Sequence, residues 1–428
     1  MKNIRKSFSL LLVSSVLTMS FVSCDKTENT TNSNKLELWT MQLKPTFNDY
    51  MNNLIAAYKK QNPNIEVEWV DLPSKEIEQK TLTSIAGGKS PDVINLNPNF
   101  TAKLAEEGAL SDLEPLVQPD IKNSYLPNIW KSSTFSGKTY GFPWYLSTAI
   151  TIYNKDLFKK AGLPDVAPKN FSELLTMGTK LKEKTGKYIY TPNFADSGKF
   201  LEFMSQQGIK LVSDDNTKAE FNTADAEKFL NFWIDLGKKG VIPKDSITQG
   251  HREAIDKFQA GETAVLVSGP QFLNIIKQNA PQLYSSLGVA PQLSGDAQKV
   301  GVGVMNLVIP ESGKNKTEAV KLAQFITNSE NQLSFAKLVT ILPSITTASK
   351  DKYFTTLSAK PTLEEEARKI SADQLTNGTI LLPQVNKWSE LSKSFDQYFQ
   401  QAYLGQITAK EALSKGEKDW NTILSQKS

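Results

Sequence analysis

The hydrophobic positions of this chain follow two periods in turn, and this predicts alternating strands and helices. KLELWT at 35–40 alternates apolar and polar residues, as in a strand with one buried face. The segment 44–63 places apolar side chains at helical spacing. NIEVEWVDL at 64–72 and SPDVINLN at 90–97 predict two more strands, and 74–88 between them predicts a helix that glycines end. This order indicates parallel strands with helices on the sheet faces.

The later part of the chain continues the same mixture. Two strands are expected within 138–154, and Pro143 between their apolar halves fits a segment that crosses between domains. FQAGETAVLVSGP at 258–270 predicts a helix end, a glycine turn, a strand and a Gly-Pro helix start. KVGVGVMNLVIP at 299–310 predicts a second crossing strand. Helices are expected at 170–186, 223–240, 315–338, 388–405 and 408–424.

Length and composition bound the fold and the chemistry. A chain of 428 residues is too long for one hydrophobic core, so we expect two α/β domains and a helical C-terminus. One histidine and one cysteine exclude a zinc site of several histidines or four cysteines. We therefore expect no metal and no cofactor. His251 begins a predicted helix, where a surface or cap role is more common than catalysis.

The N-terminus predicts where the protein is located. Residues 1–23 have a positive start and a short apolar run, the pattern of a secretory signal peptide. Ser-Cys at its end resembles a bacterial lipobox, although Phe21 stands where the usual box has leucine. The resemblance implies that Cys24 carries acyl chains such as palmitate, and two chains give stable anchoring. Residues 24–34 are polar and predict a flexible tether on the extracellular or periplasmic side of the cell membrane.

Charge argues against one class of partner. Lys2, Arg5 and Lys6 lie in the predicted signal peptide, and without them the basic residues nearly balance the 45 acidic ones. A nucleic-acid binder would show a basic excess, so we expect no nucleic-acid partner.

Six motifs, in this order, carry a family resemblance: ELWT, SPDVI, YGFPW with IYNKDLFKKAGL, FQAGETAVLVSGP, VGVGVMNLVIP and LPQVNKW. Together they resemble the sugar-binding lipoproteins of ABC importers, in the maltose-binding protein family of extracellular solute-binding proteins. The resemblance implies a two-lobed periplasmic-binding-protein-like fold of type II with a hinge. It implies a monomer without enzymatic activity that binds a sugar and delivers it to membrane permease subunits. The implied lobes are 35–142 plus 306–346, and 146–302 plus 354–428.

The resemblance extends to single positions. Asn99 falls where the maltose-binding protein uses an aspartate for sugar hydroxyls, and an amide can both donate and accept there. Lys44 falls on a ligand-contacting lysine. Ser147 replaces a carboxylate, and Gln271 replaces a stacking tryptophan. Trp388 lies near the C-terminal stacking tryptophan. The replacements argue against maltodextrin itself as the ligand.

Other candidates come from their position in the predicted fold. Ligands of open parallel sheets bind beyond the C-terminal ends of the strands, which points to Trp39 and to a loop at 97–99. Trp144 and Tyr145 could offer aromatic faces near the crossing, although neighbours in a strand face opposite sides. Gly269 precedes a helix start, where free backbone N–H groups bind hydroxyls or anions.

Two candidates belong to the predicted second lobe. Phe194 and Asp196, in TPNFADSGKF, stand where the ligand residues of that lobe cluster in the family. Flat aromatic side chains cover the apolar face of a sugar ring, and amides, carboxylates and backbone groups bind its hydroxyls.

Three alternatives remain open at this point. A surface glycosidase would need two carboxylates that flank one bond. An adhesin or scaffold would have its cleft filled by side chains. Glycerol-phosphate or another phosphorylated ligand would need a basic cleft.

Overall fold

The computed structural model describes residues 35–135, 137–385 and 387–426. The predicted signal peptide at 1–23 and the predicted tether at 24–34, with Cys24, lie outside the described residues. None of the helices in the described ranges is long and apolar enough to cross a membrane.

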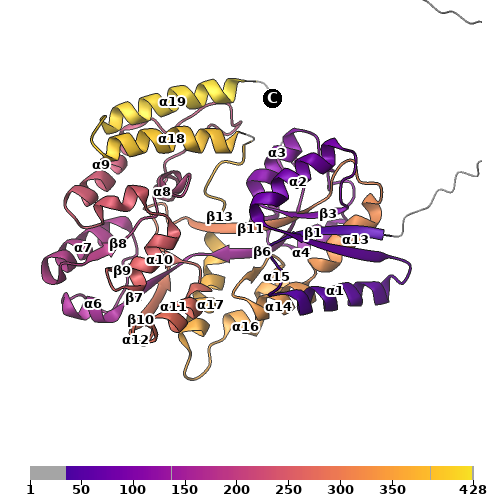
Figure 1. Ribbon diagram of the computed structural model, residues 1–428, viewed down its shortest axis with the longest axis horizontal. Coiled ribbons are helices and arrows are strands. Elements are labelled where there is room, and N and C mark those ends of the chain that lie inside the picture. Colours follow the sequence, from indigo (N-terminus) through magenta and orange to yellow (C-terminus); the bar gives the residue numbers. More distant parts are fainter. Residues whose placement is uncertain (1–34, 136, 386, 427–428) are drawn as a thin grey trace, which may run out of the picture. The chain divides into compact units, whose positions relative to one another are not determined.

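A large mixed sheet forms the framework of the first lobe (Figure 1). Its strands, in spatial order, are β12 (Leu342–Pro343), β6 (Phe142–Thr148), β11 (Val300–Val308), β3 (Val93–Leu96), β1 (Lys35–Met41) and β2 (Glu66–Leu72), and β13 (Gly378–Thr379) pairs with β11. β1 pairs in parallel with both β2 and β3, which confirms the parallel order predicted from the sequence. β11 is antiparallel to β3 and to β6.

A second sheet forms the framework of the other lobe. Its strands, in spatial order, are β10 (Leu287–Pro291), β7 (Ile150–Asn154), β9 (Thr263–Ser268) and β8 (Tyr188–Tyr190). Only Ala149 separates β6 from β7, so the chain passes directly from one sheet to the other. This confirms that the segment around Pro143 is a crossing.

Helices cover the sheets of both lobes. The main helices around the first sheet are α1 (Asn48–Gln61), α2 (Ser74–Ala86), α3 (Pro98–Glu106), α13 (Lys316–Ile326) and α14 (Ser329–Leu338). Those around the second are α6 (Lys155–Lys160), α7 (Phe171–Thr185), α8 (Lys199–Gln207), α9 (Ala224–Lys238), α10 (His251–Gln259), α11 (Phe272–Asn279) and α17 (Leu363–Asp373). The predicted loop at 97–99 is wrong in part, because Pro98 and Asn99 begin α3.

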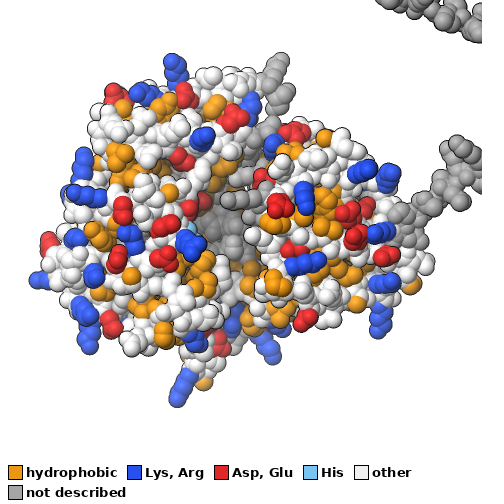
Figure 2. All heavy atoms as spheres, viewed as in Figure 1, with side chains coloured by type: hydrophobic (Ala, Val, Ile, Leu, Met, Phe, Trp, Pro, Cys, Tyr) orange, Lys and Arg blue, Asp and Glu red, His pale blue; other side chains and the backbone are white. Residues whose placement is uncertain are grey.

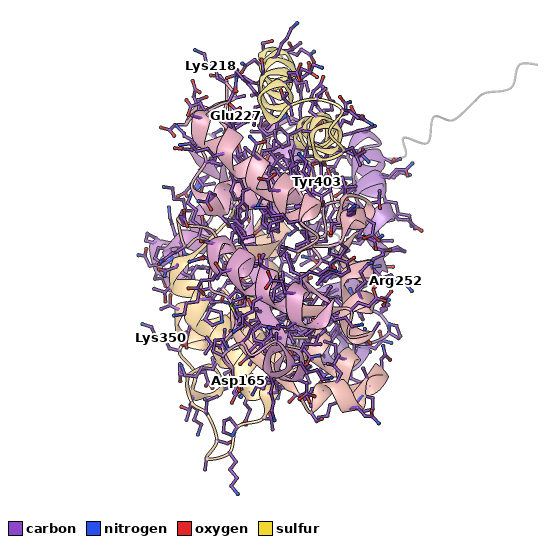
Figure 3. The ribbon with its side chains drawn as sticks, turned by 90° about the vertical axis from the view of Figure 1, so that its left-hand side faces the viewer. Asp165, Lys218, Glu227, Arg252, Lys350 and Tyr403 are labelled. Carbon is purple, nitrogen blue, oxygen red and sulfur yellow. The ribbon has the colours of Figure 1, made fainter. Side chains whose placement is uncertain are left out.

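The C-terminal helices α18 (Trp388–Tyr403) and α19 (Ala409–Ser425) pack on the second lobe, as Figures 1 and 3 show. Phe399 of α18 stacks on Phe200 of α8 with ring centroids 4.0 Å apart. Tyr403 covers Gly237 of α9 so closely that a Cβ there would lie 2.3 Å from the tyrosine oxygen. The helical C-terminus is therefore a structural part of this lobe.

The division into lobes fits the two sheets. The predicted lobe limits at 142 to 146 and at 302 to 306 fall inside β6 and β11. Each lobe has its own apolar core, one around Trp144 and Phe335 and the other around Trp233 and Phe395. The exact limits stay a prediction.

Candidate functional site

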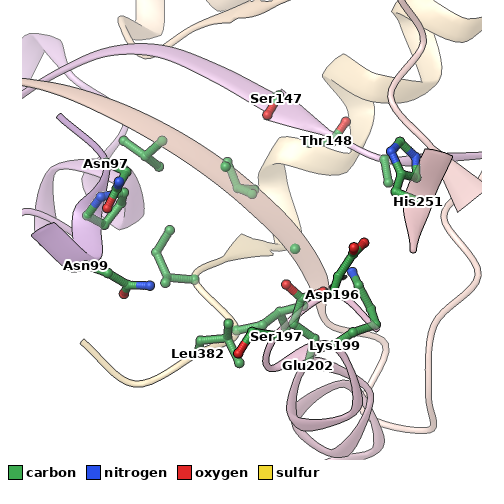
Figure 4. Close-up of a pocket in the computed structure, with 18 of the residues that line it drawn as sticks. Asn97, Asn99, Ser147, Thr148, Asp196, Ser197, Lys199, Glu202, His251 and Leu382 are labelled. Atoms are coloured by element: carbon green, nitrogen blue, oxygen red, sulfur yellow. Dashed lines mark hydrogen bonds and ion pairs between the residues drawn. The ribbon is translucent and has the colours of Figure 1, made fainter. Parts of the chain in front are cut away.

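A deep cavity lies between the two sheets, with a volume of about 1330 Å³. Residues of both lobes line it, and Figure 2 shows the surface hollowed where the lobes meet. The cavity is open to solvent and its centre is not filled by side chains, as the close-up in Figure 4 shows. A filled cleft, as expected for a scaffold, is therefore not observed.

One wall of the cavity comes from the crossing strands. Along β6, Tyr145 and Ser147 line the cavity, whereas Trp144 faces the core and is fully buried. This is the ordinary alternation of a strand. On β11, Met305 and Gly303 pair with Tyr145 and Ser147 and line the cavity beside them. A side chain at 303 would collide with Ser147, since a Cβ there would lie 2.6 Å from its hydroxyl oxygen.

The start of α3 brings Asn99 to the first-lobe side of the cavity. The Asn97 side chain caps the helix by accepting a hydrogen bond from the Phe100 N–H at 2.9 Å. Pro98 occupies the first helical position, where its missing N–H costs nothing. Asn99 therefore stands in the first turn, and its amide points toward the cavity (Figure 4).

On the opposite side, the segment from β8 to α8 carries Asp196 into the cavity (Figure 4). Asn193 donates a hydrogen bond to its carboxylate. Asp396 of α18 holds the end of this segment, because it accepts hydrogen bonds from the Gly198 N–H at 3.0 Å and the Ser197 hydroxyl at 2.9 Å. Burial raises the pKa of Asp396 to about 6.

Two further groups complete the second-lobe wall. His251 at the start of α10 shares a 2.9 Å hydrogen bond with the Ser268 hydroxyl at the end of β9. Burial lowers the pKa of His251, which favours the neutral ring. Gly269 and Gln271 follow β9, and the Gln271 amide lies directly over Gly269.

Apolar surface lines the end of the cavity near α18. Trp388, the first residue of α18, lies against Gly198, whose φ of 76° suits a glycine. Beside it, the chain after β13 contributes a short aliphatic stretch, 380–382.

Seven of the eleven predicted ligand residues line the cavity: Asn99, Tyr145, Ser147, Asp196, Gly269, Gln271 and Trp388. They come from five separate stretches of chain and from both lobes, and the fold brings them together. Their contact with a ligand stays a prediction.

The other four predicted residues lie elsewhere. Trp144 packs on Phe335 with ring centroids 5.5 Å apart. Trp39 is only 8% exposed and belongs to the first-lobe core. Phe194 lies in the aromatic core of the second lobe. Lys44 is exposed and holds its ammonium group 4.4 Å from the centroid of the Trp69 ring.

Sequence reasoning missed several polar residues that line the cavity: Glu78, Glu107, Tyr190, Asn193, Ser197, Lys199, Glu202 and Glu390. Asn97, in the stretch 97–99 to which the sequence pointed, also lines the cavity. Within the described residues, no group of three or more histidine, cysteine or acidic side chains could hold a metal ion.

Comparison with known proteins agrees with this geometry. The model of the family "Bacterial extracellular solute-binding protein" matches residues 44–333. A galactooligosaccharide-binding protein of Bacillus subtilis is 23% identical over 420 residues, which cover 96% of this chain and 95% of that protein.

Solved structures share the two-lobed fold. One is described as an oligosaccharide periplasmic-binding protein of Synechococcus sp. MITs9220 and is 35% identical to this chain. The TM-score is 0.82, and the match covers 91% of this chain and 99% of that one. A cyclic alpha-maltosyl-1,6-maltose binding protein of Arthrobacter globiformis shares the fold at 20% identity and a TM-score of 0.78, covering 91% and 98% of the two chains. The family is extracellular, which indicates a position outside the cytoplasm. The chain belongs to the family of bacterial extracellular solute-binding proteins.

Proposed function

We propose that this protein is the extracytoplasmic substrate-binding component of an ATP-driven importer, and that it binds a mono- or oligosaccharide between its lobes. The open cavity between the lobes carries the proposal, because it combines hydroxyl, amide and carboxylate groups with apolar surface. The family and the sugar-binding relatives support it. In this role the protein binds its ligand without changing it.

The cavity offers both kinds of contact that a sugar needs. Asn99 and Ser147 on one side, and Asp196 on the other, present polar groups to ring hydroxyls. Trp388 and Tyr145 present apolar surface to the C–H face of a ring. A ligand held from both lobes favours the closed arrangement, because it gains contacts there that the open one lacks.

The charge of the cavity opposes the phosphorylated alternative. Five acidic side chains line it, but only three lysines do. His251 also lines it, and its lowered pKa favours the uncharged ring. The ammonium group of Lys387 donates hydrogen bonds to carbonyl oxygens of Ile423 and Gln426, away from the cavity. A phosphate would meet a surplus of carboxylates there.

A lipid anchor on Cys24 is part of the proposal. Replacing Cys24 with alanine should move the protein from the membrane fraction to the soluble one, because the acceptor thiol is lost. Labelling with radioactive palmitate and fractionation of cells would measure this. Equal membrane retention of both forms would contradict the anchor.

Tryptophan fluorescence of the chain from Asp25 onward, titrated with mono-, di- and oligosaccharides, tests the binding function. We expect a saturable change with at least one sugar, since Trp388 lines the cavity. The sugar should be recovered intact, and chromogenic glycosides should not be cleaved. Cleavage at the rate of a glycosidase would support the enzyme instead and overturn the proposed receptor.

A further inference from the structure

A carboxylate faces the cavity on its second-lobe wall. The carboxylate of Asp196 can only accept hydrogen bonds. A group that binds at this carboxylate must therefore donate hydrogen bonds.

The hydroxyl of Tyr190, on the same wall, is a second group that favours a bound ligand. Its side chain is 98% buried and lines the cavity, yet its hydroxyl makes no hydrogen bond within the described residues. The carboxylates of Glu202 and Asp196 both act on it electrostatically, and burial raises its pKa, so the hydroxyl stays protonated and uncharged. Its oxygen is a further acceptor for a ligand group.

The charge of Asp196 is not neutralised by a nearby cation. Among the described residues it forms no ion pair. Lys199, three residues later, pairs with Glu202. His251 faces Asp196, but its burial favours the neutral ring. One negative charge therefore remains on this wall, in a setting where water is partly excluded and electrostatic attraction is stronger than in bulk solvent.

We propose that this wall is a subsite for a protonated amine, so that the preferred ligand is an amino sugar or an oligosaccharide with an amino-substituted ring. An ammonium group supplies several donors and a positive charge, which match the carboxylate of Asp196 and the hydroxyl oxygen of Tyr190. A neutral hydroxyl supplies one donor and leaves the charge uncompensated. This inference rests on the proposed sugar-binding function.

The test compares each neutral sugar with its 2-amino-2-deoxy counterpart: glucose with glucosamine, galactose with galactosamine, and cellobiose with chitobiose. Calorimetric titration in mildly acidic buffer measures the dissociation constants. We expect the amino form of the bound sugar to bind about tenfold more tightly than the neutral form, which corresponds to about 1.4 kcal/mol. Added salt should reduce this preference.

Asp196→Asn should lower the affinity for the amino form much more than the affinity for the neutral form, and so abolish the preference, because the amide keeps the shape and loses the charge. Tyr190→Phe should weaken it, since the phenylalanine keeps the buried ring and lacks the oxygen. Asp214→Asn is the matched control, because it removes the same charge from a side chain that is 96% exposed. It should leave the preference unchanged.

The outcomes separate this inference from the proposed function. If neutral sugars bind as tightly as their amino forms, or the preference survives in Asp196→Asn, the amine subsite is wrong and the sugar receptor stands. If no sugar of either kind binds, both proposals fail.

Discussion

Replacing Trp144 with alanine is expected to lower the free energy of unfolding by about 3–5 kcal/mol, the usual cost of deleting a buried tryptophan side chain. Trp144 is fully buried and packs against Phe335 and Tyr145. The substitution leaves a cavity in the first-lobe core, because the surrounding side chains relax only partly into such a space. Chemical denaturation followed by circular dichroism would measure the loss.

A Trp144→Phe variant is the control for this prediction. Its loss should be clearly smaller, because the ring remains and the indole N–H, which is buried without a partner among the described residues, is removed. The alanine variant should keep its ligand affinity at temperatures where it is folded. Unchanged stability together with lost binding would contradict the core position of Trp144 and support its predicted role as a ligand-binding residue.

Asp396→Asn is expected to have a higher free energy of unfolding than the wild type at neutral pH. The difference between the two proteins should be about 2–3 kcal/mol larger at neutral pH than in acid. The pKa of Asp396 is raised from 3.8 to about 6, first because of burial. A raised pKa means that the folded state binds the proton more tightly than the unfolded state does. The stability contributed by the protonated form is therefore complete below pH 3.8 and is lost as the pH rises through about 6.

Asparagine does not titrate, so the difference in free energy of unfolding between the variant and the wild type should grow as the pH rises over this range. Urea denaturation at several pH values measures it. The matched control is Asp419→Asn, since that carboxylate also accepts a hydrogen bond from a side chain of α18, at 2.7 Å from Tyr398. A difference that does not depend on pH would contradict the raised pKa of Asp396.

The sequence predicted the main strands and helices because their hydrophobic periods were long and regular. The parallel pairing of β1 with β2 and β3 and the crossing at Pro143 agree with the structure. The loop predicted at 97–99 was wrong in part, because the capping signal of Asn97 and Pro98 was read as a turn. The fold was thus predictable wherever local pattern and tertiary packing favour the same element.

The site was only partly predictable. Tyr145 and Trp144 are adjacent and equally aromatic, and only the register of β6 against β11 decides which one faces the cavity. Phe194 and Asp196 lie in one segment, yet packing takes the first into the core and leaves the second at the cavity. Tyr190 gave no local signal, because its position depends on contacts between segments far apart in the chain.

The melting temperature of the chain from Asp25 onward, with and without a series of neutral and amino sugars, tests the central claim most directly. The account predicts that one of these sugars, at about 100 times its dissociation constant, stabilises the wild type by about 2.7 kcal/mol. The same concentration should stabilise Asn99→Ala less, because that amide lines the cavity. A series in which no sugar raises the melting temperature, in a protein that is folded and monodisperse, would contradict the assignment of this protein as a sugar receptor.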